Sequence, residues 1–141
     1  MKILIPIDGS ENSLRALRYL LEQRAEYRDV PELHLLNVQS AVASGAVKMF
    51  IHDDQLRQYY QEEAGKALHE ARKLLDDAGV AYRHHIVVGE VGPSIARFAR
   101  EHGCAKIVMG TRGLGAVSSA IVGSVTTQVI QYADRPVLLV K

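Results

Sequence analysis

The chain has 141 residues and a mass of 15.5 kDa, with 48% hydrophobic residues, 23% charged residues and a formal net charge of +1. This length fits one domain, residues 1–141, and the composition excludes a disordered, collagen-like or coiled-coil chain. A nearly neutral chain also argues against a protein whose partner is nucleic acid or an anionic membrane.

Five segments of the chain predict β-strands. The first is a continuous apolar run without alternation, which is typical of a strand buried on both faces of a parallel sheet. The strands are predicted at residues 2–7, 33–38, 82–88, 106–109 and 136–140. In the second strand, Asn37 interrupts the apolar run.

Amphipathic segments between these strands predict helices. Apolar residues recur at helical spacing from Ser10 onwards and at residues 53–78, 93–102 and 122–133. Ser10 is suited to cap the first helix, and Gly79 and Gly103 are suited to end the second and third. Residues 39–51 are small and weakly patterned, and we expect a long loop there.

The alternation of strands and helices predicts an α/β fold in which a parallel sheet carries helices on both faces. Right-handed crossovers leave few topologies, and we predict a doubly wound open sheet. In such sheets ligands bind beyond the carboxyl ends of the strands, where the winding reverses. Residues 6–10 and 110–115 follow the first and fourth strands and are expected at that edge.

The segment after the fourth strand has the chemistry of a phosphate cradle. Its glycines permit close approach of the backbone, and Gly123-Ser124 stands at the head of the last helix, where free N–H groups favour phosphate. The alternative is a connector whose glycines only make turns. Neither a Walker A pattern nor a dinucleotide fingerprint after the first strand is present.

The spacing Gly110-x2-Gly113-x9-Gly123-Ser124 resembles the nucleotide signature of the universal stress protein family, Gly-x2-Gly-x9-Gly-Ser/Thr. The opening Ile5-Pro6-Ile7-Asp8-Gly9-Ser10 and the ending Arg135-Pro136-Val137-Leu138-Leu139-Val140 are similar to the family as well, so the resemblance covers the whole chain. It implies a five-stranded sheet in the order 3-2-1-4-5, with Asp8 beside Gly110.

The resemblance also implies an ATP site. The residues that would hold ribose and phosphates are Gly110, Gly113, Gly123, Ser124 and Val125. Asp8 would lie near them and is the candidate metal ligand, through nucleotide-bound Mg²⁺. The adenine side would be formed by Pro6, Ile7, Val38 and Met109, with main-chain hydrogen bonds from Val38.

Other candidate residues have two interpretations each. Asp8 either serves this site or only caps the turn with Gly9, and Arg112 either meets phosphate or faces solvent.

Family members commonly dimerise through the last strand, here Val137–Val140, and an exposed apolar edge strand invites such pairing.

The remaining titratable residues are given structural roles. His84 and His85 are adjacent on a strand and point to opposite faces, so they do not chelate one ion. Surface or helix-end positions are expected for the scattered histidines His34, His52, His69 and His102. Cys104 is expected to be a small buried hydrophobe.

The chain is expected to be a soluble cytoplasmic protein. A single cysteine favours a reducing compartment, and the apolar N-terminal run is too short for a signal peptide. No apolar run approaches the about 20 residues that span a bilayer.

We predict a homodimeric, ATP-binding sensor or regulator of the stress response. The sequence shows no catalytic constellation such as a Gly-x-Ser-x-Gly elbow, which predicts slow ATP hydrolysis at best. One alternative is an interaction protein without nucleotide, which the uncharged residues 114–122 favour. A further alternative is an enzyme, either a slow ATPase or a phosphotransferase. The last is a protein that binds flavin or another adenine nucleotide.

Overall fold

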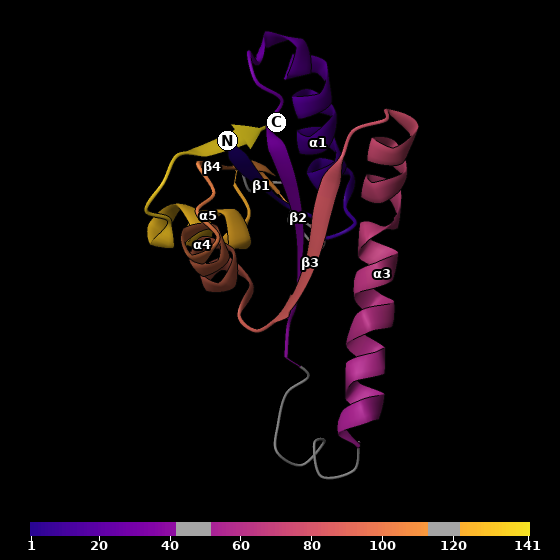
Figure 1. Ribbon diagram of the computed structural model, residues 1–141. Helices are drawn as coiled ribbons and strands as arrows, with labels where there is room; N and C mark the ends of the chain where they lie inside the picture. Colours follow the sequence, from indigo (N-terminus) through magenta and orange to yellow (C-terminus); the bar gives the residue numbers. More distant parts are fainter. Residues whose placement is uncertain (42–51, 113–121) are drawn as a thin grey trace.

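A computed structural model describes residues 1–41, 52–112 and 122–141. These residues form a five-stranded, all-parallel sheet in the order β3-β2-β1-β4-β5 (Figure 1). Its strands are β1 (Lys2–Pro6), β2 (Glu32–Gln39), β3 (Tyr82–Val88), β4 (Lys106–Gly110) and β5 (Val137–Val140). The predicted α/β class and strand order are confirmed.

Helices cover both faces of this sheet. The α-helices of the described residues are α1 (Glu11–Gln23), α3 (Asp53–Asp77), α4 (Val91–Glu101) and α5 (Ser124–Tyr132). The first two pack on one face, and α4 and α5 pack on the other (Figure 1). A short 3₁₀ helix, η1 (Arg24–Glu26), extends α1 and was not predicted from the sequence.

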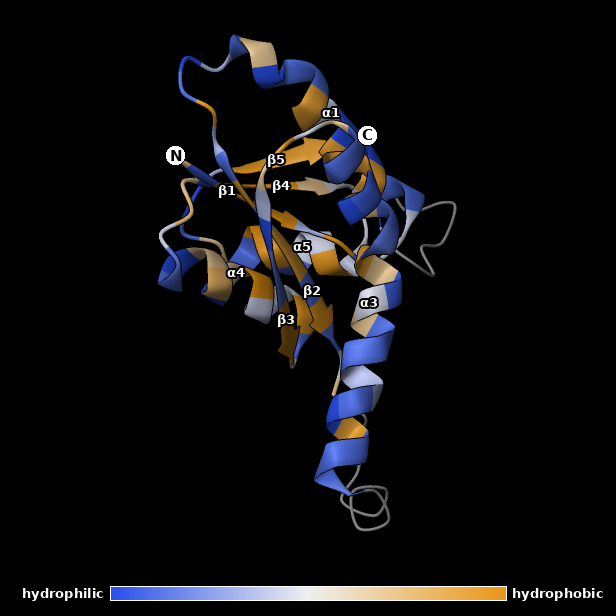
Figure 2. Cartoon of the chain, turned by 45° about the vertical axis from the view of Figure 1, so that its right-hand side comes forward, coloured by the Kyte–Doolittle hydropathy of each residue, from blue (hydrophilic) through white to orange (hydrophobic). Residues whose placement is uncertain are grey.

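The continuous apolar run of β1 is explained by burial on both faces. Ile3 and Ile5 belong to the core under α1 and α3, while Leu4 belongs to the core under α4 and α5. All three side chains are fully buried. Figure 2 shows hydrophobic colours concentrated on the strands, whereas most of the visible surface of α3 is hydrophilic.

The predicted helix ends are confirmed by the backbone. The Ser10 side chain caps α1 by accepting a hydrogen bond from the Ser13 amide at 3.2 Å. Gly79 and Gly103 follow α3 and α4 with φ angles of 64° and 63°, which L side chains rarely adopt. Of the predicted loop 39–51, Gln39 ends β2 and residues 42–51 lie outside the described residues.

Cys104 is buried at 1% exposure, as predicted, and burial raises the pKa of its thiol. None of the described helices has an apolar stretch long enough to cross a membrane.

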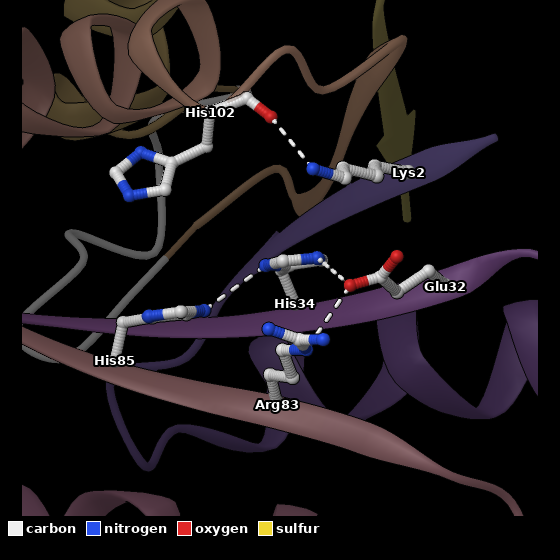
Figure 3. A network of polar contacts seen from close by, with 6 residues as sticks. All are labelled: Lys2, Glu32, His34, Arg83, His85 and His102. Atoms are coloured by element: carbon white, nitrogen blue, oxygen red, sulfur yellow. Dashed lines mark hydrogen bonds and ion pairs between the residues drawn. The ribbon is translucent and has the colours of Figure 1, made fainter.

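The expectation of a surface or helix-end position is wrong for His34. This residue is only 3% exposed, and its ring lies nearly parallel to that of His85, with the ring centres 5.1 Å apart (Figure 3). Its Nδ1 lies 3.0 Å from Nε2 of His85, and its Nε2 lies 2.9 Å from a Glu32 carboxylate oxygen, which Arg83 also contacts at 3.1 Å. These partners satisfy both ring nitrogens, which is why the imidazole is buried.

The Glu32 carboxylate fixes the position of one proton in this network. A carboxylate only accepts hydrogen bonds, so Nε2 of His34 carries a proton and donates a hydrogen bond to Glu32. Nδ1 of His34 and Nε2 of His85 share one further proton, and the tautomers of the two rings decide which nitrogen carries it. Burial lowers the pKa of His85, and the neighbouring His34, His102, His84 and Arg83 lower it further.

This network predicts that the protein loses stability on acidification. The unfolded chain binds a proton at His85 that the folded chain resists, so the free energy of unfolding falls as the pH drops below about 6.5. Urea unfolding between neutral and mildly acidic pH measures this slope. The His85→Gln variant, which keeps a hydrogen-bonding side chain beside His34 but cannot take up a proton, is expected to show a shallower slope.

A matched control is His69→Gln, because His69 is an exposed histidine on α3. That variant should keep the full pH dependence of the unmodified protein. Parallel stability curves for His85→Gln and the unmodified protein would contradict the account.

Candidate functional site

A cavity of about 350 Å³ opens at the carboxyl ends of β1, β2 and β4. The chain leaves β1 toward α1 on one face and leaves β4 toward α5 on the other, so the connections diverge there. The volume lies in the range of small-molecule sites, which for open α/β sheets occur at this switch point.

The sequence-predicted site residues meet at this cavity. Those that line it are Pro6, Ile7, Asp8, Val38, Met109, Gly110, Arg112, Gly123, Ser124 and Val125. Gly113, the remaining predicted residue, lies outside the described residues. Segments about 100 residues apart in sequence are therefore brought to one opening because β1 pairs directly with β4.

Asp8 both closes a turn and lines the cavity, so its two interpretations are compatible. One carboxylate oxygen accepts a hydrogen bond from the Ser10 amide at 2.9 Å. Gly9 follows with φ of 84°, and a Cβ there would lie 3.2 Å from the Cα of Ala67 on α3. The tight Asp8–Ser10 turn, packed against α3, holds the carboxylate at the edge of the cavity.

Gly110 ends β4 at a place where no side chain fits. A Cβ on it would lie 2.6 Å from the carbonyl oxygen of Asn12, in the first turn of α1. Its own carbonyl accepts from the Thr126 hydroxyl at 3.2 Å, and the Gly123 amide donates to the Thr111 carbonyl at 2.7 Å. Close packing and two hydrogen bonds thus hold the end of β4 between α1 and α5.

The N-terminus of α5 faces this opening. Gly123 is its N-cap residue and has no side chain to accept from the first amides of the helix. Ser124 and Val125 at this end line the cavity. Exposed amides and the helix dipole make such an end favourable for an anion.

The opposite wall of the cavity is apolar and was only partly predicted. The lining residues that sequence reasoning missed are Ser13, Leu36, Ser40, Val91, Ile95 and Thr126. Val91 and Ile95 are one turn apart on α4, which follows β3, and that spacing is visible in the sequence. Their place against β2 and β4 follows only from the packing of α4 on the sheet.

The electrostatics of the cavity are nearly balanced. Among its described lining residues, the charged side chains are Asp8 and Arg112. The described residues contain no group of three or more His, Cys, Asp or Glu side chains placed to hold a metal ion. The arrangement is an apolar slot that opens onto a helix N-terminus, suited to a flat apolar group joined to an anion.

Comparison with known proteins agrees over the full length of the chain. The sequence profile described as the universal stress protein family matches residues 1–141. Universal stress protein MJ0531 of Methanocaldococcus jannaschii is 30% identical over 141 residues, covering 99% of this chain and 81% of its own length.

Solved structures of the same kind superpose closely. That of MJ0577, also from Methanocaldococcus jannaschii, has a TM-score of 0.84 and 32% identity, covering 99% of this chain and 94% of that chain. A universal stress protein in complex with cAMP has a TM-score of 0.70 and 25% identity, covering 100% and 97% of the two chains.

The universal stress protein from Archaeoglobus fulgidus in complex with dAMP has a TM-score of 0.65 and 25% identity, covering 100% and 98% of the two chains. With a family match over every residue and relatives of the same fold, this chain belongs to the universal stress protein family.

Proposed function

We propose that this chain binds an adenine nucleotide, with ATP as the working ligand, in the cavity at the ends of β1, β2 and β4. The observation that carries the proposal is the cavity itself. It joins an apolar slot formed by Val38, Val91 and Met109 to the uncapped N-terminus of α5. The complexes of two relatives with cAMP and dAMP support an adenine nucleotide as the ligand class.

In this proposal the base lies in the apolar slot and the phosphates lie at α5. The amides at the start of α5, the Ser124 hydroxyl and Arg112 offset phosphate charge. Gly110, Gly113 and Gly123 let the main chain approach the ribose and phosphates. In this proposal Asp8 lies on the phosphate side, where its carboxylate would hold a nucleotide-bound Mg²⁺, an ion that prefers oxygen ligands.

The proposed role is regulation rather than catalysis. The cavity lining of the described residues offers no histidine, and its one carboxylate, that of Asp8, is assigned in this proposal to the Ser10 amide and to Mg²⁺. We therefore propose that residues 1–141 act as one cytoplasmic domain that reports nucleotide state in the stress response, with slow hydrolysis at most.

The ligand assignment is tested by calorimetric titration of nucleotide-stripped protein with AMP and with ATP plus Mg²⁺. We expect micromolar binding. The Val91→Trp variant is expected to weaken it about tenfold or more, equivalent to at least ~1.4 kcal/mol, because the indole takes up much of the apolar slot. Val30→Trp is the matched control, since Val30 is 85% exposed and does not line this cavity.

A folded protein that gives no heat with millimolar AMP or ATP would refute the proposal. That result would favour an interaction protein without nucleotide, the reading that the uncharged residues 114–122 also favour.

We propose further that the protein is a homodimer paired through β5, the edge strand beside β4. Pro136 and Val140 accept hydrogen bonds from the β4 side, from the amides of Ile107 and Thr111. Successive residues of a strand alternate in the direction of their main-chain groups, so those of Val137 and Leu139 point away from β4. No other strand of the described residues pairs with these outward groups, so they form an edge that a second copy can extend.

The dimer proposal predicts different outcomes for two changes at Leu139. Leu139→Pro removes an outward amide without removing a β4 hydrogen bond, so it should shift the protein from dimer to monomer in sedimentation velocity. Leu139→Ala loses the same side chain and keeps the amide, so it should remain largely dimeric. If the folded Leu139→Pro variant stays dimeric, the interface lies elsewhere.

A further inference from the structure

Asn37 is a buried amide in the middle of a hydrophobic strand. It is 2% exposed and stands between Leu36 and Val38 on β2. Burying an amide is unfavourable unless its hydrogen bonds are made. Its Nδ2 donates to the carbonyl of Ile7 at 2.7 Å, and its Oδ1 accepts from Nε2 of Gln39 at 2.6 Å.

The pairing of β1 with β2 ends where Asn37 bonds to Ile7. The register runs from Lys2 opposite Glu32 to Pro6 opposite Leu36, and the Ile7 amide then donates to the Leu36 carbonyl at 2.8 Å. In a parallel ladder the next bond would run from the Val38 amide to the Ile7 carbonyl. In this part of the described chain, the Asn37 side chain takes that carbonyl instead.

The main chain of Val38 consequently faces the cavity. The carbonyl of the next residue, Gln39, accepts from the Gly89 amide on the β3 side at 2.9 Å. Because main-chain direction alternates along a strand, the amide and carbonyl of Val38 point to the β1 side. There β1 has ended, and Val38 lines the cavity.

A neighbouring amide and carbonyl offer one donor and one acceptor to a planar ring. Adenine presents the complementary pair on its Watson–Crick edge, a ring nitrogen that accepts and an amino group that donates. Guanine presents a ring N–H that donates and a carbonyl that accepts, so its pattern is reversed. The main chain of Val38 is therefore able to distinguish the two bases.

We propose that Asn37 is a positioning residue that ends the β1–β2 ladder one step early and thereby leaves the Val38 main chain, without a partner among the described residues, open to read the base. The role of Asn37 in the ladder stands on the geometry alone. Its role in base selection rests on the proposed nucleotide function.

Amide hydrogen exchange tests the first part without any nucleotide. In the free protein, the Val38 amide should exchange much faster than the Leu36 amide, which lies within the β1–β2 pairing. In Asn37→Leu, the Val38 amide is free to bond to the Ile7 carbonyl and should become protected. A Val38 amide as protected as that of Leu36 in the free unmodified protein would overturn the proposal.

Binding of AMP and GMP tests the second part. Asn37→Leu should lower the preference for AMP over GMP by about tenfold, because one base-reading bond is worth that order of discrimination. Leu33→Ala is the control, since Leu33 is buried on the same strand and face and its loss weakens the core without changing the ladder. It should leave the preference unchanged.

The two failures are distinguishable. If Asn37→Leu weakens AMP and GMP binding by the same factor, the base-reading role of Asn37 is refuted. If the unmodified protein binds neither nucleotide, the proposed function fails, and hydrogen exchange at Val38 still decides whether Asn37 ends the ladder.

Discussion

The structure depends on the direct pairing of β1 with β4 at the point where the sheet reverses its winding. The close contact between Gly110 and Asn12 belongs to this constraint, because a Cβ at Gly110 would lie 2.6 Å from the Asn12 carbonyl oxygen. Because Gly110 has no side chain, α1 packs against the end of β4. The connections that follow β1 and β4 then run to opposite faces of the sheet, and the cavity opens between them. The cavity is therefore a consequence of topology and close backbone packing.

A glycine also permits close packing at the wall of the cavity formed by α4 and α5. Gly92 brings the first turn of α4 so near α5 that a Cβ would lie 2.4 Å from the Cβ of Gln128. The Thr126 hydroxyl then ties α5 to the Gly110 carbonyl. Both helices that border the cavity are thus held by contacts within the protein, which reduces the ordering that ligand binding would require.

The local features of this fold were readable from the residues themselves, whereas the long-range ones were either reached through the family resemblance or missed. The strand order and the convergence of Asp8 with Gly110 followed from the resemblance that the glycine spacing carries. The burial of His34 depends on its contact with His85, 51 residues away. No local sequence pattern predicts a contact over that distance. The reason for Asn37 was equally hidden, because its partner is a main-chain carbonyl on another strand. Gly110 was predicted to contact the ligand or only to make a turn, whereas its packing against Asn12 needs a glycine in any case.

The most direct test of the central claim is to follow backbone amide chemical shifts while AMP is added. The account predicts the largest changes at Asp8, Val38, Gly110 and Ser124, which line the cavity from four different segments. The amides of His34 and His85, near the buried histidine pair, should change little. Changes confined to other surfaces, or none at saturating AMP, would contradict the account.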